Sequence, residues 1–133
     1  MMWRRIVAVC SIALIAGGCA TEPMRNLQRG FQNLFQTGKG KPALEAGLRQ
    51  YEEGAYVEAS RNLQTALEHG LDSASQVDAH KHLAFIHCAS NRTGPCRDEF
   101  RKALKINPAL ELSAAEAGHP AWGPVFRSVK TGR

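Results

Sequence analysis

The sequence has no apolar run long enough to cross a membrane and no cluster of positive charge. Its main apolar run, from Ile6 to Ala16, has eleven residues, whereas a transmembrane helix needs about twenty. Arg4 and Arg5 lie in a predicted leader. From Cys19 onward the chain has fifteen Lys and Arg and twelve Asp and Glu, which gives a net charge of +3. These charges are spread along the chain and no aromatic residues alternate with them, so the sequence does not indicate nucleic-acid binding.

Motifs of catalysis are also missing. The chain contains no Gly-rich phosphate loop, no nucleophile elbow and no HExxH sequence. Glu52-Glu53 and Asp98-Glu99 are adjacent carboxylates, but neighbours on a helix point about 100° apart and cannot flank one bond. We therefore expect both pairs to be solvated. We predict a protein that is not an enzyme and that has no cofactor or resident metal.

The N-terminal residues have the features of an export signal. The chain has 133 residues, of which 22% are charged and 44% hydrophobic, and this composition is ordinary for one globular domain. Arg4 and Arg5 precede the apolar run and small residues follow it, as in a secretion leader. Ala16-Gly17-Gly18-Cys19 resembles a bacterial lipobox, in which the cysteine is acylated and becomes the new N-terminus. We predict a leader over residues 1–18 and a lipidated Cys19, the alternative being cleavage without lipidation.

The resemblance to bacterial lipoproteins also implies a location. Ala20 follows the cysteine where an aspartate would favour retention in the inner membrane, so we expect a lipid anchor on the periplasmic face of the outer membrane. Residues 19–40 form a predicted tether with a short amphipathic helix. Its apolar residues are Met24, Leu27, Phe31, Leu34 and Phe35. This stretch can lie on the membrane surface; the alternative is that it packs on the folded domain or stays mobile.

Residues 41–108 repeat with a period of 37. The matching pairs are Gly47 and Ala84, Gly54 and Asn91, Ala59 and Cys96, Leu63 and Phe100, Ala66-Leu67 and Ala103-Leu104, and Leu71 and Pro108. Small residues recur where two helices must touch. The pattern predicts first helices that end near residues 53 and 90, and second helices over residues 56–69 and 95–106. Turns are expected at Gly54 and over residues 91–95.

The repeated segments resemble tetratricopeptide repeats. Residues 51–59, Leu63 and the pair Ala66-Leu67 match that signature, and residues 100–108 match the end of a second repeat. The usual period is about 34 residues, so we expect an insertion around residues 70–75. The resemblance implies an all-α fold over residues 41–133 with two helix-turn-helix repeats.

Two repeats are fewer than a stable stack requires, so the open ends need a cap. Residues 114–118 and 122–130 can form further helical turns, with Pro120 and Pro124 marking the breaks. We predict a C-terminal capping helix whose apolar stripe packs in the core, since an exposed stripe of this kind would lower solubility. The stripe consists of Trp122, Val125, Phe126 and Val129.

The chain from Cys19 onward is similar to the TssQ family of lipoproteins associated with type VI secretion. Three segments carry this resemblance: residues 79–86, with the sequence AHKHLAFI; residues 96–104, with CRDEFRKAL; and residues 116–127, with EAGHPAWGPVFR. The resemblance implies an accessory protein of the type VI secretion apparatus that works through protein partners of the cell envelope. A pilotin-like or outer-membrane assembly lipoprotein of another envelope machine is the alternative.

In tetratricopeptide repeats the first helix of each pair lines a concave face. Carried over to this chain, the resemblance assigns six partner-binding residues: Leu44, Leu48, Tyr51, Asp78, Lys81 and Phe85. Aromatic rings in such a groove can anchor a peptide or helix. The alternative is that two repeats form too short a groove and that the C-terminal helix fills it.

Two cysteines remain after the leader and Cys19 are set aside. Cys88 lies near the end of one predicted helix and Cys96 near the start of the next. Antiparallel packing brings such positions together, and an oxidising periplasm supports a bond between them. We predict a disulfide, the alternative being two buried free thiols.

Three histidines offer a different class of function. His80 and His87 are seven residues apart on a predicted helix, and His82 is close by. A small periplasmic protein that binds a metal or ligand through these side chains is therefore a further alternative. The spacing is no strong metal signature, and we expect His80 and His87 to pack between helices.

Overall fold

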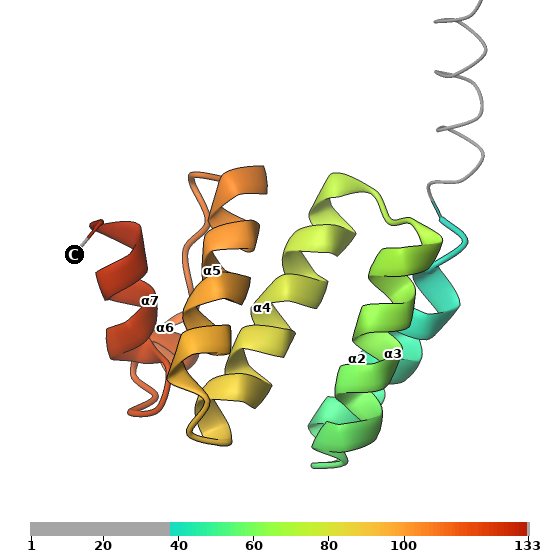
Figure 1. Cartoon of the computed structure of the whole chain (residues 1–133), viewed down its shortest axis with the longest axis horizontal. Helices are drawn as coiled ribbons and strands as arrows, with labels where there is room; N and C mark the ends of the chain where they lie inside the picture. The colour runs from blue at the N-terminus through green and yellow to red at the C-terminus, as the bar shows by residue number, and fades with distance from the viewer. Residues whose placement is uncertain (1–37, 133) are drawn as a thin grey trace, which may run out of the picture.

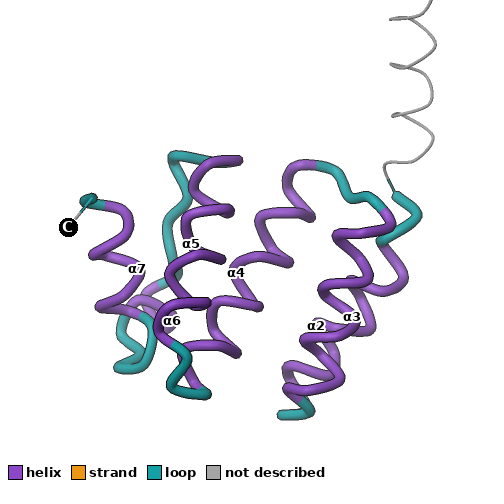
Figure 2. Tube along the Cα trace, viewed as in Figure 1, coloured by secondary structure: helices purple, strands orange, loops and turns teal. Residues whose placement is uncertain are grey.

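A computed structural model describes residues 38–132 of the chain. The predicted leader, Cys19 and the amphipathic stretch of the tether lie outside these residues. Figures 1 and 2 show the described part as a row of helices joined by short loops. The helices are α2 (Lys41–Glu52), α3 (Tyr56–His69), α4 (Ser73–Ala89), α5 (Thr93–Ile106), α6 (Ala114–Ala117) and α7 (Gly123–Lys130). Over residues 38–132 the fold is all-α and has no strand, as predicted.

The first two helices form an antiparallel hairpin. Gly47 of α2 faces α3 so closely that an added Cβ would lie 2.9 Å from the Leu63 side chain and 3.2 Å from the Ala59 carbonyl oxygen. Ala59 and Leu63 are fully buried. The small residues in the sequence therefore mark the contact between these helices, as predicted.

The second hairpin, α4 with α5, follows the same plan at the predicted spacing. Asn91 in its turn has a positive φ of 59°, and Gly54 in the first turn has a φ of 79°. Both turns thus contain a residue in the left-handed backbone conformation, which glycine and asparagine adopt more readily than other residues. Cys96 and Phe100 are fully buried, like Ala59 and Leu63 in the first hairpin.

Helix α4 is longer than α2 and extends further at its beginning. Helix α4 has 17 residues and α2 has 12. Asp72 caps α4, because its side chain accepts a hydrogen bond from the backbone N–H of Ser75 at 3.0 Å. The additional residues predicted around 70–75 are therefore partly the first turn of α4.

The described chain begins at the end of α3 that is opposite the Gly54 turn. The backbone N–H groups of Gly38 and Gly40 donate to the Gly70 carbonyl oxygen at 3.2 and 3.1 Å. Gly40 is packed so tightly that an added Cβ would lie 2.0 Å from the Ala66 carbonyl oxygen. The start of the domain is therefore fixed against α3. None of the helices within residues 38–132 is long and apolar enough to cross a membrane.

Two apolar clusters form the core. The first lies between α2, α3 and α4 and contains Leu44, Ala59, Leu63, Ala66, Leu71, Ala79, Leu83 and Ile86. The second joins α4 and α5 to the C-terminal segment and contains Ala84, Phe85, Cys88, Cys96, Phe100, Trp122 and Phe126. Trp122 and Phe126 are buried, as predicted for the C-terminal stripe, and their burial closes one end of the helix row.

Candidate partner-binding site

The predicted partner-binding residues come from two neighbouring helices. Helix α2 contributes Leu44, Leu48 and Tyr51, and α4 contributes Asp78, Lys81 and Phe85. Their exposure differs widely. Asp78 is exposed, and Leu48, Tyr51 and Lys81 are half-buried. Leu44 and Phe85, with 5% and 1% exposure, belong to the core.

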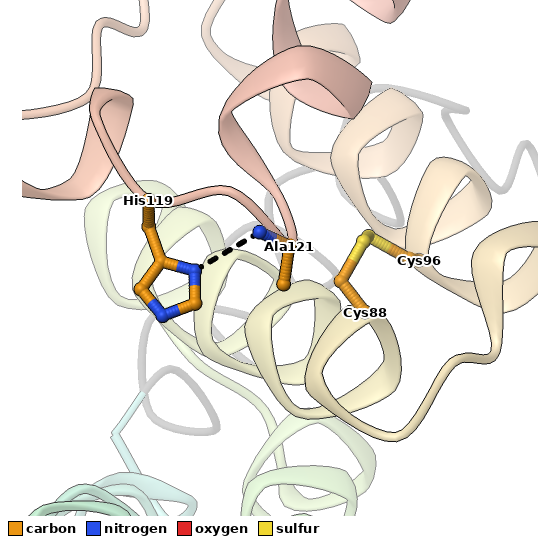
Figure 3. Close-up of a disulfide and its surroundings, with 4 residues drawn as sticks. All are labelled: Cys88, Cys96, His119 and Ala121. Carbon is orange, nitrogen blue, oxygen red and sulfur yellow. Dashed lines mark hydrogen bonds between the residues drawn. A yellow bond between two sulfur atoms is a disulfide. The ribbon is translucent and has the colours of Figure 1, made fainter.

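Phe85 is covered by the C-terminal segment. The Trp122 ring stacks on the Phe85 ring with centroids 4.5 Å apart, and the His119 ring stacks on the Trp122 ring with centroids 3.4 Å apart. The Nδ1 atom of His119 also accepts a hydrogen bond from the Ala121 backbone N–H at 3.2 Å (Figure 3). The expectation of an accessible Phe85 ring is therefore wrong. The C-terminal segment fills this part of the groove, which was the alternative.

Tyr51 connects the two apolar clusters and keeps part of its ring accessible. Its centroid lies 5.0 Å from that of His82, 5.6 Å from that of Tyr56 and 6.3 Å from that of Phe85. Burial raises the pKa of the Tyr51 phenol, and the nearby Tyr56 and Glu116 raise it further. The hydroxyl group is thus protonated at neutral pH and can donate a hydrogen bond.

An ion pair holds the C-terminal segment over α4. The Lys81 Nζ atom lies 2.9 Å from Glu116 Oε1, and both side chains are at least three-quarters buried. Burial raises the pKa of the Glu116 carboxyl, but hydrogen bonds from Lys81 and from the Ser113 backbone outweigh this effect and lower it. Ser113 and Glu116 also form the capping box of α6. Lys81 therefore forms its ion pair within the chain.

The predicted disulfide is present. Cys88 at the end of α4 is bonded to Cys96 in the first turns of α5, with Cα atoms 5.2 Å apart (Figure 3). The two residues are 5% and 0% exposed and belong to the cluster that contains Phe85 and Trp122. The bond thus ties together the hairpin on which the C-terminal segment packs.

His80 and His82 of α4 contact separate partners. His80 Nδ1 lies 2.6 Å from Glu99 Oε2, and His82 Nδ1 lies 2.8 Å from the Asp78 backbone oxygen. Within residues 38–132 no group of three or more His, Cys, Asp or Glu is arranged to hold a metal ion. Burial lowers the pKa of both His82 and His87, so both rings are neutral at neutral pH.

Glu99 is the site residue that sequence reasoning missed. The expectation of a solvated carboxylate is wrong, because Glu99 is 9% exposed and binds both His80 and the Lys102 Nζ atom at 2.6 Å. Burial raises its pKa, but the hydrogen bonds and charges of His80 and Lys102 outweigh this effect and lower it. The period of 37 does not predict this pair: the equivalent Asn62 donates to Gln50 across the first hairpin at 2.7 Å, and Gln50 corresponds to His87 rather than to His80.

Comparison with known proteins gives no further guide to the family. No protein-family model, no curated protein and no solved structure matches the chain.

Proposed function

We propose that this protein is a lipoprotein held by Cys19 on the periplasmic face of the outer membrane. Its helical domain acts as an accessory scaffold of the type VI secretion apparatus through protein–protein contacts. The buried Cys88–Cys96 disulfide is the observation that carries the proposal. Such bonds persist in oxidising compartments and are rare in the cytosol. The leader-like residues 1–18 and the lipobox-like Ala16–Cys19 support the same location independently.

The two hairpins, in this proposal, are tetratricopeptide-like repeats. Support comes from positions 37 residues apart that play the same part in each hairpin. Gly54 and Asn91 have positive φ values in the turns, and Ala59 and Cys96 are both fully buried where the helices touch. A row of such hairpins presents helix surfaces to other proteins. Within residues 38–132, the C-terminal segment covers one end of the row and no described segment covers the α2 and α3 end.

The experiment compares a host strain that lacks the gene with strains complemented by the wild-type chain or by Cys19→Ser. The wild-type protein should be acylated by intact mass, should sediment with outer membranes and should restore type VI secretion. Cys19→Ser cannot be acylated, so it should be soluble in the periplasm or remain an uncleaved precursor, and it should not restore secretion. Wild-type protein without fatty acid, or secretion that is unaffected by loss of the gene, contradicts the proposal.

A further inference from the structure

Two neighbouring apolar side chains at the start of α3 are only partly covered by residues 38–132. Tyr56 is 42% exposed and Val57 is 63% exposed, and they are the large hydrophobic residues that residues 38–132 leave exposed. Single exposed hydrophobic residues are common, whereas adjacent ones beside a hollow indicate a contact surface. These two residues lie outside the groove considered above.

A hollow of about 220 Å³ adjoins this pair, between the first half of α3 and the end of α4. Its lining consists of Tyr56, Val57, Ser60, Arg61, Gln64, Ile86, Ser90 and Arg92. The apolar part can receive one side chain of a partner. The polar residues around it can hydrogen-bond to the partner's backbone.

The charge of this surface has one sign. Arg61 and Arg92 line the hollow and no acidic residue does. Both arginines are exposed, and neither forms an ion pair with any residue in the range 38–132. Guanidinium groups bind carboxylates with two parallel hydrogen bonds, so an acidic partner fits this surface best.

The hollow also lies far from the end where the tether joins the domain. The described chain begins beside Gly70 at the C-terminal end of α3, whereas most of the α3 residues that line the hollow lie in the N-terminal half of this helix. A helix of 14 residues is about 20 Å long. A domain anchored through residue 38 can therefore present the hollow away from the membrane.

We propose that this surface docks an acidic segment of a protein partner. An apolar side chain of the segment packs on Tyr56 and Val57, and carboxylates on either side of it pair with Arg61 and Arg92. The inference takes one point from the proposed scaffold function, namely that the partner is a protein of the cell envelope. It differs from the groove predicted from the repeats, because its residues come from α3 and from the end of α4.

The experiment uses the full chain in its host, with a photo-crosslinking amino acid at position 57. After irradiation, the cross-linked peptide is sequenced. We expect a partner segment in which Asp or Glu flank an apolar residue. Arg61→Glu combined with Arg92→Glu should lower the yield about fivefold, because both pairs become repulsive. Arg61→Gln with Arg92→Gln should lower it less. Thermal melts of each purified variant show whether it is folded.

The matched control, Arg97→Glu with Lys105→Glu, makes the same change in net charge at exposed positions of α5 outside this hollow and should leave the yield unchanged. Three outcomes would overturn the inference. These are an equal loss of cross-link in the control, no effect of the Arg61 and Arg92 substitutions, and cross-links only to lipid or to a second copy of the chain.

The secretion assay separates the two proposals. If secretion requires the wild-type chain but position 57 gives no such cross-link, this surface is rejected and the scaffold function stands. If secretion is independent of the chain, the scaffold function is rejected. The cross-linking result by itself then shows whether this surface docks an acidic segment.

Discussion

The Trp122 ring stacks on the Phe85 ring with centroids 4.5 Å apart and an interplanar angle of 26°. Trp122 comes from the C-terminal segment and Phe85 from the second half of α4. Phe85 also meets the Phe100 ring edge-on at 5.9 Å, so one ring links the segment to both helices of the second hairpin. This contact closes the hairpin on the side where the repeat pattern alone predicts an open groove.

Replacing Trp122 tests how far the domain depends on that closure. Trp122→Ala should lower the free energy of unfolding by about 3–5 kcal/mol, because a buried aromatic ring leaves a cavity. Trp122→Phe should cost much less, since it keeps a ring on Phe85 and removes the indole N–H, which has no hydrogen-bond partner within the described residues. Urea denaturation of the soluble Cys19→Ser protein measures both. A loss below about 1 kcal/mol for Trp122→Ala would mean that the segment does not stabilise the domain.

Reduction of the Cys88–Cys96 bond should destabilise the same hairpin. The bond closes a short loop, with a sequence separation of 8, so loop closure predicts a loss of about 2–3 kcal/mol. The double variant Cys88→Ala with Cys96→Ala should melt at a similarly lowered temperature, and a reductant should not lower it further. Two titratable thiols in unreduced Cys19→Ser protein isolated from the periplasm and then unfolded would exclude the bond in the cell.

The Glu99 carboxylate should make stability depend on pH in the acid range. Because its pKa is lowered in the folded protein, ionised Glu99 stabilises the fold above its ordinary pKa of 4.5, and this stability is lost as the pH falls through the folded value. Glu99→Gln should flatten that part of the profile and cost about 1–3 kcal/mol at pH 7. The control is Asp98→Asn, an exposed neighbour. The test is to measure the denaturation midpoint of each protein from pH 3 to 7. If the midpoints of wild-type protein and Glu99→Gln depend on pH in the same way, Glu99 does not cause the pH dependence.

Gly40 should be intolerant of any side chain. An alanine Cβ would lie 2.0 Å from the Ala66 carbonyl oxygen, so Gly40→Ala must displace the start of the domain from α3 and should cost more than about 1 kcal/mol. Gly94 offers a matched control, because an added Cβ there meets no atom within 4 Å. Gly94→Ala in the first turn of α5 should be neutral or stabilise by up to about 1 kcal/mol. Equal thermal shifts for the two variants would refute the close contact.

Much of the local structure could be predicted from the sequence. The expected second helix over residues 56–69 coincides with α3, Tyr56–His69. The turns at Gly54 and Asn91 and the pairing of Cys88 with Cys96 also follow the prediction. These features depend on residues that are close in the chain or on the repeat of 37, so the pattern itself contains the necessary information.

Tertiary structure decided which of these residues remain accessible. The repeat pattern assigned Phe85 to a concave face, but Trp122 covers it. Glu99 has the sequence context of a solvated carboxylate, but His80, 19 residues earlier, pairs with it between α4 and α5. Burial depends on what packs against a helix face from distant parts of the chain. Periodicity therefore identified the helices, the turns and the disulfide, whereas only the packing of distant segments determined which of these side chains are buried.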